Sequence, residues 1–375
     1  MRKFFAIFAA AALVLSLAAC NNESNNGGNN NSGDGSSSTT STTPEEKSEE
    51  SSTTPEETPD ESGDDTSGEE EPPVLAGVAD PEDITADPLV YLSFDDEESV
   101  SKLTAVHQVA NTEDPNLTGA TYALVDSVHE ILIADGYGAV GNSLMLDGKY
   151  GVKVNDMPQT SGDSYTIAFW YAADRYSQFG PLLQIGRNVG MNDQENEVAW
   201  INFTKTDTWS ITGEECAPVA WNRNSGENTW PWIGNNLDLL GKREWVHVAL
   251  VADGTIYTDS AGLNHVGATF YVNGIPVMTA SEADIGLFDE TGVPIINDWK
   301  GISANILKGD GVYGVECLMG VNYWDQYSKE YIDEFYLFDE ALTAGQIATL
   351  YNQGNPPEYE TMPAYDGPVD DTTEG

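Results

Sequence analysis

The alternation of apolar and polar residues is clearest near the end of the chain, between Tyr331 and Phe338. Read as an extended strand, this stretch is bulky on both faces, with Tyr331, Phe335 and Leu337 on one and Ile332, Tyr336 and Phe338 on the other. Such a strand is covered on both sides, so the pattern predicts the middle of a sandwich. The acidic neighbours Asp333 and Glu334 interrupt it and are expected to point to opposite faces.

A short helix is predicted directly after this strand. Thr343 and Gln346 have the spacing of a capping box, and Ile347, Leu350 and Tyr351 form an apolar stripe. Gly354 stands where a helix would stop. We expect two turns that close the domain.

The preceding 250 residues read as strand after strand, because short runs of aromatic and β-branched residues alternate with Gly, Asp, Asn and Pro clusters. No helical segments alternate with them. The predicted fold class is therefore all-β, a two-sheet antiparallel jelly-roll sandwich. The predicted strands are Pro88–Phe94, Ser143–Leu146, Tyr150–Val154, Tyr165–Ala172, Pro181–Ile185, Glu197–Phe203, Trp245–Val251, Thr269–Val272 and Tyr331–Phe338.

Several of these segments resemble, in order, the bacterial laminin-G-like domains of the concanavalin A-like superfamily. They are YLSFDDE at 91–97, GNSLMLDGKYGVKV at 141–154, YTIAFWY at 165–171, REWVHVALVADG at 243–254, ATFYVNG at 268–274, and the closing strand with its helix. The resemblance covers residues 86–354 and implies a jelly-roll domain. It leaves the function open, since this superfamily contains lectins, glycosidases and plain interaction domains.

The first 20 residues have the pattern of a targeting segment. Arg2 and Lys3 precede an apolar run, and Leu17-Ala-Ala-Cys20 resembles a lipobox, which implies cleavage before Cys20 and a lipid on its thiol. An ordinary secretory signal is the alternative. We therefore expect a lipoprotein on the extracellular face of a bacterial membrane, or of the outer membrane where the cell has one.

Residues 21–75 form a Ser-, Thr-, Asn-, Pro- and Glu-rich stretch that cannot bury enough apolar surface to fold, and residues 355–375 have a similar acidic, proline-rich composition. We interpret the first as a disordered tether and the second as a disordered tail. The formal charge of -47 excludes nucleic acid and anionic lipid head groups as partners, because both would be repelled. Cations, neutral sugars and basic proteins remain.

Tryptophans in and around a long insertion, residues 205–240, are the candidate binding residues. Indole faces stack on the C–H faces of pyranose rings, while amide and carboxylate side chains bond the hydroxyls. The competing interpretation is a satellite core built by the same indoles. Trp170 and Trp245 lie in predicted strands and are expected in the core. The candidate ligand-binding set is Trp200, Asn202, Trp209, Trp221, Trp230, Trp232, Trp324 and Asp325.

The resemblance also implies a structural calcium site in many jelly rolls of this kind. It maps onto Asp333 of the closing strand, with the Asp95 and Gly148 regions expected nearby. Asp333 could instead accept backbone hydrogen bonds from a neighbouring loop. Cys216 and Cys317 could form a disulfide in an exported domain, or remain free thiols.

Motifs for catalysis are weak. The nearest match to a jelly-roll glycosidase motif, Glu282-Ala-Asp284, lacks the third carboxylate. The glycine motif Gly136-Tyr-Gly-Ala-Val-Gly141 leads into a strand, so we interpret it as a turn and not as a phosphate loop. We expect a monomeric protein that binds a glycan or cell-wall polysaccharide. A glycosidase and a protein-binding adhesion module are the alternatives.

Overall fold

The computed structural model divides the chain into two units, residues 1–70 and 71–375, and the fold described below belongs to the second. None of the helices in the described residues is long and apolar enough to cross a membrane. The structure describes residues 77–112, 121–175, 181–188, 200–204, 215–216, 219–223, 232–234, 240–241, 244–258, 264–280, 302–303, 306–308, 314–358 and 366–367.

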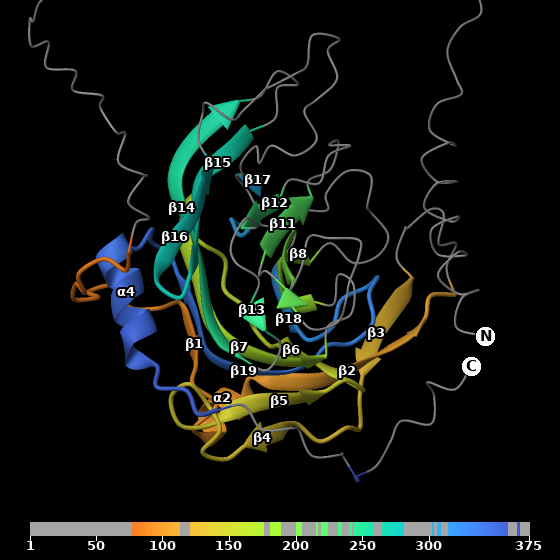
Figure 1. Cartoon of the computed structure of the whole chain (residues 1–375). Helices are drawn as coiled ribbons and strands as arrows, with labels where there is room; N and C mark the ends of the chain where they lie inside the picture. The colour runs from red at the N-terminus through yellow and green to blue at the C-terminus, as the bar shows by residue number, and fades with distance from the viewer. Residues whose placement is uncertain are drawn as a thin grey trace, which may run out of the picture. The chain divides into compact units, whose positions relative to one another are not determined.

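Two antiparallel sheets form the domain, as the sequence predicts (Figure 1). Sheet A has nine strands, with a main path β16-β15-β14-β7-β19-β5-β4, while β1 also pairs with β19 and β17 with β15. Its strands are β1 (Val90–Leu92), β4 (Leu132–Ala134), β5 (Ser143–Asp147), β7 (Ser164–Arg175), β14 (Trp245–Thr258), β15 (Asn264–Val272), β16 (Ile275–Ala280), β17 (Ile302–Ser303) and β19 (Lys329–Phe338).

Sheet B has eight strands in the order β12-β11-β9-β8-β18-β6-β2-β3. They are β2 (Leu103–Ala110), β3 (Tyr122–Asp126), β6 (Gly151–Val154), β8 (Pro181–Asn188), β9 (Trp200–Thr204), β11 (Val219–Arg223), β12 (Trp232–Gly234) and β18 (Gly314–Met319). A separate pair consists of β10 (Glu215–Cys216) and β13 (Leu240–Gly241). The nine predicted strands all correspond to strands of the structure.

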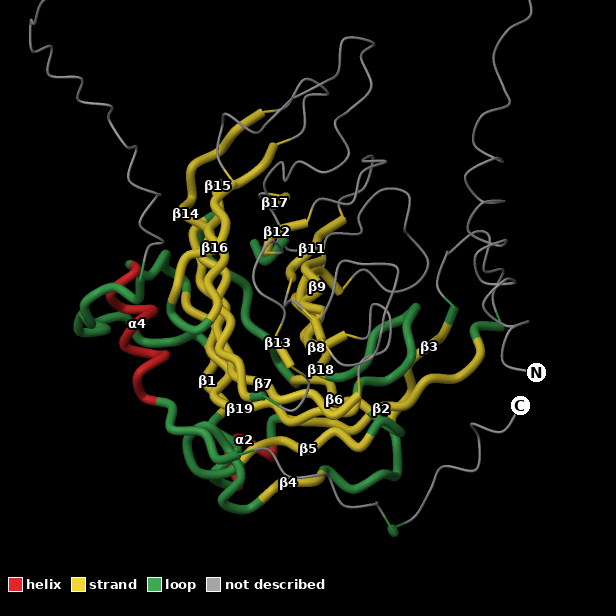
Figure 2. Tube along the Cα trace, viewed as in Figure 1, coloured by secondary structure: helices red, strands yellow, loops and turns green. Residues whose placement is uncertain are grey.

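One hydrophobic core fills the space between the sheets. Alternate residues of β7, β14 and β15 from sheet A meet alternate residues of β2, β6, β8 and β18 from sheet B. Phe169, Phe270 and Phe335 are fully buried in it. Each fully buried aromatic side chain of this kind contributes roughly 2–3 kcal/mol to stability. Figure 2 shows the strands of the two layers and the loops that link them.

The closing strand β19 lies in the middle of sheet A, between β7 on one side and β5 and β1 on the other. The helix that follows it, α4 (Ala344–Gln353), has the predicted capping box between Thr343 and Gln346, and it buries Ile347 and Leu350. Gly354 ends the helix, but its role is steric: a Cβ there would collide with the Trp170 indole. A second helix, α2 (Glu97–Ser101), is a single turn.

The outer face of sheet A, the face turned away from the core, is covered by α4 and by a cluster of aromatic residues. Trp170 and Trp245 are buried in this cluster and pack with Tyr331, which confirms that they are core residues. His247 lies beside Trp170, with 5.3 Å between the ring centroids, and burial lowers its pKa to about 3.

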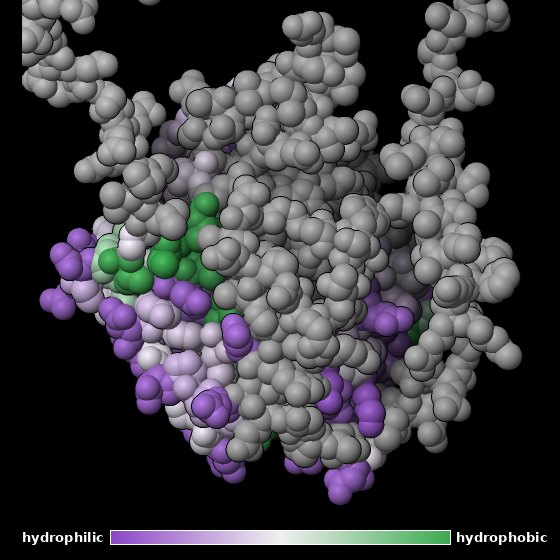
Figure 3. Space-filling model, viewed as in Figure 1, coloured by the Kyte–Doolittle hydropathy of each residue, from purple (hydrophilic) through white to green (hydrophobic). Residues whose placement is uncertain are grey.

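Segments on both sides of the predicted boundaries pack onto this face. The backbone N–H of Glu82 donates to the Gly345 carbonyl, and the Asn355 N–H donates to the Ala139 carbonyl. The Tyr137 hydroxyl reaches the carbonyl of Glu358 at 2.8 Å. The folded unit therefore extends beyond 86–354. On the face that Figure 3 shows, an apolar patch lies beside α4, and much of the remaining coloured surface is hydrophilic.

Candidate functional site

Five residues on five neighbouring strands of sheet B occupy one cross-strand row, which we call the tryptophan row. Its members are Trp232 on β12, Trp221 on β11, Asn202 on β9, Gln184 on β8 and Leu318 on β18. Directly opposite residues in an antiparallel sheet share a face. Leu318 packs outside the main core, while its neighbours Cys317 and Met319 lie within it. The row therefore lies on the outer face of sheet B.

A second row runs parallel to the first, two residues further along each strand. It contains Arg223, Trp200, Gly186 and Glu316 at opposed register positions. Because side chains alternate between faces, positions two residues apart share a face. Four of the predicted ligand-binding residues, Trp200, Asn202, Trp221 and Trp232, are thus placed on one face of one sheet.

Gln184 is not among the predicted site residues, although the sequence contains a signal for it. It is the one polar residue in the apolar run Leu182–Ile185, and a polar residue there needs a partner on the face opposite the core. Trp209 and Trp230, the other predicted tryptophans of the insertion, lie outside the described residues.

Trp324 and Asp325 lie on the loop of residues 320–328, which packs over β18 and β2 on this same outer face. The Asn322 side chain organises the loop: its Oδ1 accepts from the backbone N–H groups of Trp324 and Asp325, and its Nδ2 donates to Asp325 Oδ2 at 2.8 Å. The Gln108 amide on β2 donates to the carbonyls of Asn322 and Asp325 at 2.8 and 2.6 Å. These bonds fix the loop to the sheet.

The Asp325 carboxylate is thus held inside its own loop by Asn322, and burial raises its pKa to about 6. Trp324 beside it is half-buried, and its ring meets Tyr323 edge-on with 5.7 Å between the centroids. The Tyr323 hydroxyl donates to Glu316 of the second row at 2.8 Å, which connects the loop to the strand below.

A group of carboxylates gathers at the opposite sheet, around a bulge in β19. The register of β19 shifts between Asp333 and Tyr336, and Glu334 has a φ of 50°. The Glu334 carboxylate accepts hydrogen bonds from the hydroxyls of Tyr91 and Tyr336 at 2.9 and 2.6 Å, and both tyrosines stand on the outer face. Asp333 pairs with Trp170 of the same face. The expectation that the two acids point to opposite faces is wrong, because the bulge adds a residue and resets the alternation.

The Gly136–Gly141 turn wraps around Asp333 and Asp95. Val140 N–H donates to Asp333 Oδ2 at 2.9 Å, and Asn142 N–H donates to Asp95 Oδ1 at 2.7 Å. A Cβ on Gly138 would lie 2.6 Å from Asp333 Oδ2, and one on Gly141 would collide with the Asp95 carboxylate. These glycines are needed so that the backbone can approach the two carboxylates closely. Gly148, by contrast, follows β5, about 16 Å along the strand from this turn.

The Asp333 and Glu334 carboxylates at the bulge of β19 have raised pKa values. Burial raises the pKa of Asp333 to about 8, and the negative charges of Glu334 and Asp95 raise it further, against the backbone N–H of Val140. Burial also raises the pKa of Glu334, and the nearby Asp95 adds to that effect. Within the described part of the chain, no lysine, arginine or histidine is among the groups that shift the pKa values of Asp333 and Glu334.

The chemistry of this end fits a hard cation such as calcium, which prefers carboxylate and carbonyl oxygens. Asp95 and Asp333 can each offer a carboxylate lone pair, and the Asn142 carbonyl points toward the space beside Gly138. No group of three or more His, Cys, Asp or Glu side chains arranged for a metal occurs among the described residues. The remaining ligands of a calcium ion here would therefore be backbone carbonyls and water.

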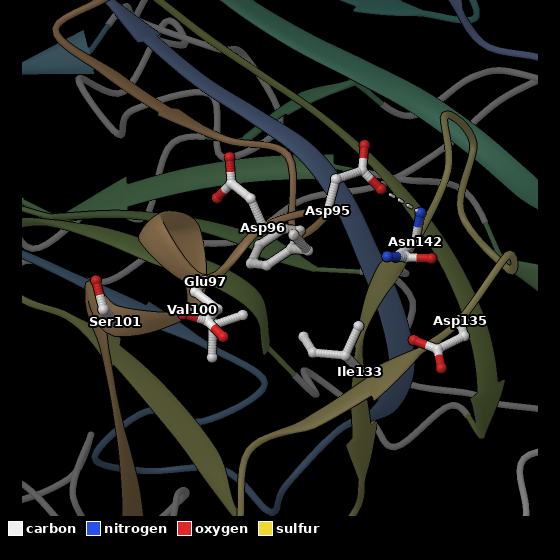
Figure 4. A pocket seen from close by; sticks show the side chains of 9 residues that line it. Asp95, Asp96, Glu97, Val100, Ser101, Ile133, Asp135 and Asn142 are labelled. Atoms are coloured by element: carbon white, nitrogen blue, oxygen red, sulfur yellow. Dashed lines mark hydrogen bonds between the residues drawn. The ribbon is translucent and has the colours of Figure 1, made fainter.

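An open pocket of about 410 Å³ lies next to this group. Asp95, Asp96 and Asp135 line it together with the apolar side chains of Ile133 and Val100, and Asn142 closes one side (Figure 4). Asp96 is occupied as the N-cap of α2, where it accepts from the Ser99 N–H at 2.8 Å. Figure 4 shows Asp95 bonded to Asn142 at the rim of the pocket.

A glycosidase of the jelly-roll type needs two carboxylates about 5 to 10 Å apart. On the outer face of sheet B, the carboxylates within the described strands are Glu316 on β18 and Asp126 on β3. They are separated by three strand spacings, roughly 14 Å, and by about four residues along the strand direction, so the two carboxylates lie more than about 14 Å apart. These strand positions do not form a catalytic pair.

The two cysteines of the domain do not pair in this structure. Cys317 is a free thiol, fully buried in the core on β18, and burial raises its pKa. Cys216 lies on β10 of the separate two-stranded pair. Of the two alternatives for Cys317, the structure contains the free thiol.

Fold and site together define a two-sheet antiparallel β-sandwich whose sheet B carries rows of aromatic and amide residues on its outer face. No family model matches the sequence, and no curated protein matches it either. Several solved structures do match.

One match is domain 4 of AbnA, a GH43 extracellular arabinanase from Geobacillus stearothermophilus, in complex with arabinotriose. The two chains are 17% identical, the match covers 71% of this chain and 98% of the arabinanase domain, and the TM-score is 0.41. The receptor binding domain of botulinum neurotoxin type G is 13% identical over 66% of this chain, with a TM-score of 0.31. The binding domain of Paraclostridial Mosquitocidal Protein 1 is 13% identical over 66%, with a TM-score of 0.32. The match spans 50% and 52% of these two structures. At such identities a likeness describes no more than the fold.

Proposed function

We propose that this chain is a glycan-binding module that acts outside the bacterial cell, where a lipid on Cys20 holds it to the membrane. The observation that carries the proposal is the tryptophan row. It places Trp221 and Trp232 at directly opposed positions on neighbouring strands, with Asn202 as the next residue in the row.

The spacing of these positions suits a sugar chain. Opposed residues of an antiparallel pair have Cβ atoms about 5 Å apart, close to the length of one pyranose unit. Two tryptophans at such positions supply adjacent stacking surfaces, and the asparagine beside them supplies hydrogen bonds to hydroxyls. The formal charge of -47 favours a neutral glycan over a polyanionic one.

The test is a binding measurement with neutral soluble polysaccharides, first on a glycan array and then by calorimetry. The double variant Trp221→Ala/Trp232→Ala should lose binding while its melting temperature stays within a few degrees of wild type. The control variant is Tyr91→Ala, which removes an aromatic side chain that is 39% exposed on the outer face of sheet A. Wild-type affinity in the double variant would place the site elsewhere, and no binding to any glycan would favour a protein-binding module.

We also propose a structural calcium ion at Asp95 and Asp333, held with backbone carbonyls of the Gly136–Gly141 turn. Its support is the close approach of this turn to the two carboxylates, and no cation of the described residues is among the groups that shift the pKa of Asp333. The ion would neutralise the charge that accumulates at the bulge of β19. Added calcium should raise the melting temperature of wild type, and a chelator should lower it.

The lipid anchor has a direct test. Mass spectrometry of the protein from membranes should find a diacylglycerol-modified cysteine at a new N-terminus, and Cys20→Ser should release the protein or leave its signal uncut. An uncleaved, unmodified Cys20 in membrane-bound protein would refute the anchor without affecting the glycan site.

A further inference from the structure

Gln184 is a buried polar residue on the face that carries the tryptophan row. It lies on β8 between Leu183 and Ile185, which both point into the core, so its amide belongs to the opposite face. The side chain is only 4% exposed.

The carbonyl oxygen of this side chain, Oε1, has no hydrogen-bond partner among the residues that the structure describes. An unsatisfied buried acceptor is unfavourable, and native proteins rarely leave one without a reason. The oxygen can only accept, so whatever satisfies it must be a donor.

Gln108 provides an internal comparison. It is also a buried glutamine on the outer face of sheet B, on β2. Its amide is satisfied by the loop of residues 320–328, through the carbonyls of Asn322 and Asp325 at 2.8 and 2.6 Å. The fold therefore uses one glutamine of this face to hold a loop, while the acceptor of the other is not used by any residue that the structure describes.

The position of Gln184 indicates what the donor belongs to. On one side its row neighbour is Leu318, which is packed under that loop. On the other side its neighbour is Asn202, followed by Trp221 and Trp232. Adjacent strands are about 4.8 Å apart, so a chain stacked on the tryptophans and bonded to Asn202 would bring its next group within reach of Gln184.

We propose that Gln184 is a ligand-binding residue, whose Oε1 accepts a hydrogen bond from a glycan hydroxyl or amide N–H. This inference rests on the proposed function and adds to it a polar end of the binding row, next to the loop that carries Trp324. It also makes the site selective, because a sugar without the matching donor would leave the acceptor unpaired on binding.

The experiment compares Gln184→Met with Gln108→Met in the full chain. Methionine has nearly the same length and volume as glutamine but lacks the amide. Gln184→Met should bind the glycan about 10- to 100-fold more weakly, as expected for one lost hydrogen bond to a buried acceptor. Its melting temperature should stay equal or rise, because an unsatisfied polar group has been removed. Gln108→Met should lower the melting temperature, since it deprives two loop carbonyls of their donor.

A Gln184→Met variant that loses stability as Gln108→Met does, and keeps wild-type affinity, would show a purely structural glutamine and overturn the inference. The outcome is separable from that of the proposed function. If Trp221→Ala/Trp232→Ala loses binding and Gln184→Met keeps it, the glycan site stands and the role of Gln184 falls. If wild type binds no glycan, both fall.

Discussion

Replacing Asp333 by asparagine should destabilise the protein at acidic pH and stabilise it at alkaline pH. The Asp333 carboxyl is fully buried, and its pKa is raised from 3.8 to about 8 in the folded protein, mainly by burial. Between these two pH values the folded state holds a proton that the unfolded state has released. Stability therefore falls as pH rises through this window.

The magnitude follows from the two pKa values. Their difference of about 4 corresponds to at most about 6 kcal/mol, and water entry on ionisation reduces this to roughly 3 kcal/mol. Asparagine cannot ionise, so this contribution disappears in Asp333→Asn. At pH 5 the variant should be less stable than wild type by about 1 kcal/mol, because only one of the two backbone N–H donors, those of Val140 and Glu334, still finds a carbonyl oxygen.

Urea unfolding of both proteins in chelator, at pH 5 and pH 8, measures the difference directly. Comparing the variant with wild type at each pH cancels the contributions of the other acidic residues. We expect Asp333→Asn to be less stable at pH 5 and more stable at pH 8, with a change of roughly 2 kcal/mol between them, because this interval spans about two thirds of the window. Calcium at pH 8 should restore stability to wild type and leave the variant unchanged. An equal stability difference at both pH values would refute the reasoning.

Three further predictions concern single residues. In wild type, the raised pKa of Asp325, about 6, makes the fold less stable as pH rises from 4 to 6, and Asp325→Asn should reduce this loss. Melting temperatures that change equally with pH in both proteins would contradict this. Gly141→Ala should lower the free energy of unfolding by more than about 2 kcal/mol and Gly136→Ala by only about 1 kcal/mol, because both glycines have positive φ but only Gly141 faces a carboxylate. Equal losses of unfolding free energy in chemical denaturation would show that the contact with Asp95 is irrelevant. Cys317 should react with a thiol reagent only after denaturation, and rapid labelling of the native protein would contradict its burial in the core.

The sequence predicts the sandwich well because its central strands carry strong local patterns. β7, β14 and β19 are long and apolar, and α4 has its capping box in the sequence. Ten strands of the described structure are not predicted, among them β2 and β18 inside sheet B; β3 and β4 lie at sheet edges, and their residues are exposed or half-buried. Edge strands of that kind depend on their neighbours for hydrogen bonds more than on their own composition.

The site is less predictable, because its arrangement depends on register. Trp221 and Trp232 are eleven residues apart and show no shared period, yet pairing of β11 with β12 makes them direct neighbours. The carboxylate end illustrates the same limit. Asp333 and Glu334 are adjacent in sequence, so the alternation of a regular strand places them on opposite faces. The positive φ of Glu334 and the register shift show that a bulge turns both to one side. The Gly136–Gly141 turn has a local signal, but its closeness to Asp333 comes from the pairing of β5 with β19.

The two outer faces of the sandwich use their aromatic residues differently, and this contrast favours sheet B as the binding side. On sheet A, Trp170 and Trp245 are buried under α4, the Gly136–Gly141 turn and the segment after the helix, where they add to stability. On sheet B, the tryptophans of β9, β11 and β12 occupy rows beside amide residues, and the loop of residues 320–328 packs over β18 and β2. The side-chain acceptor of Gln184, which has no partner among the described residues, lies at the boundary between this loop and the tryptophans, where a ligand bound along the tryptophan row would reach it.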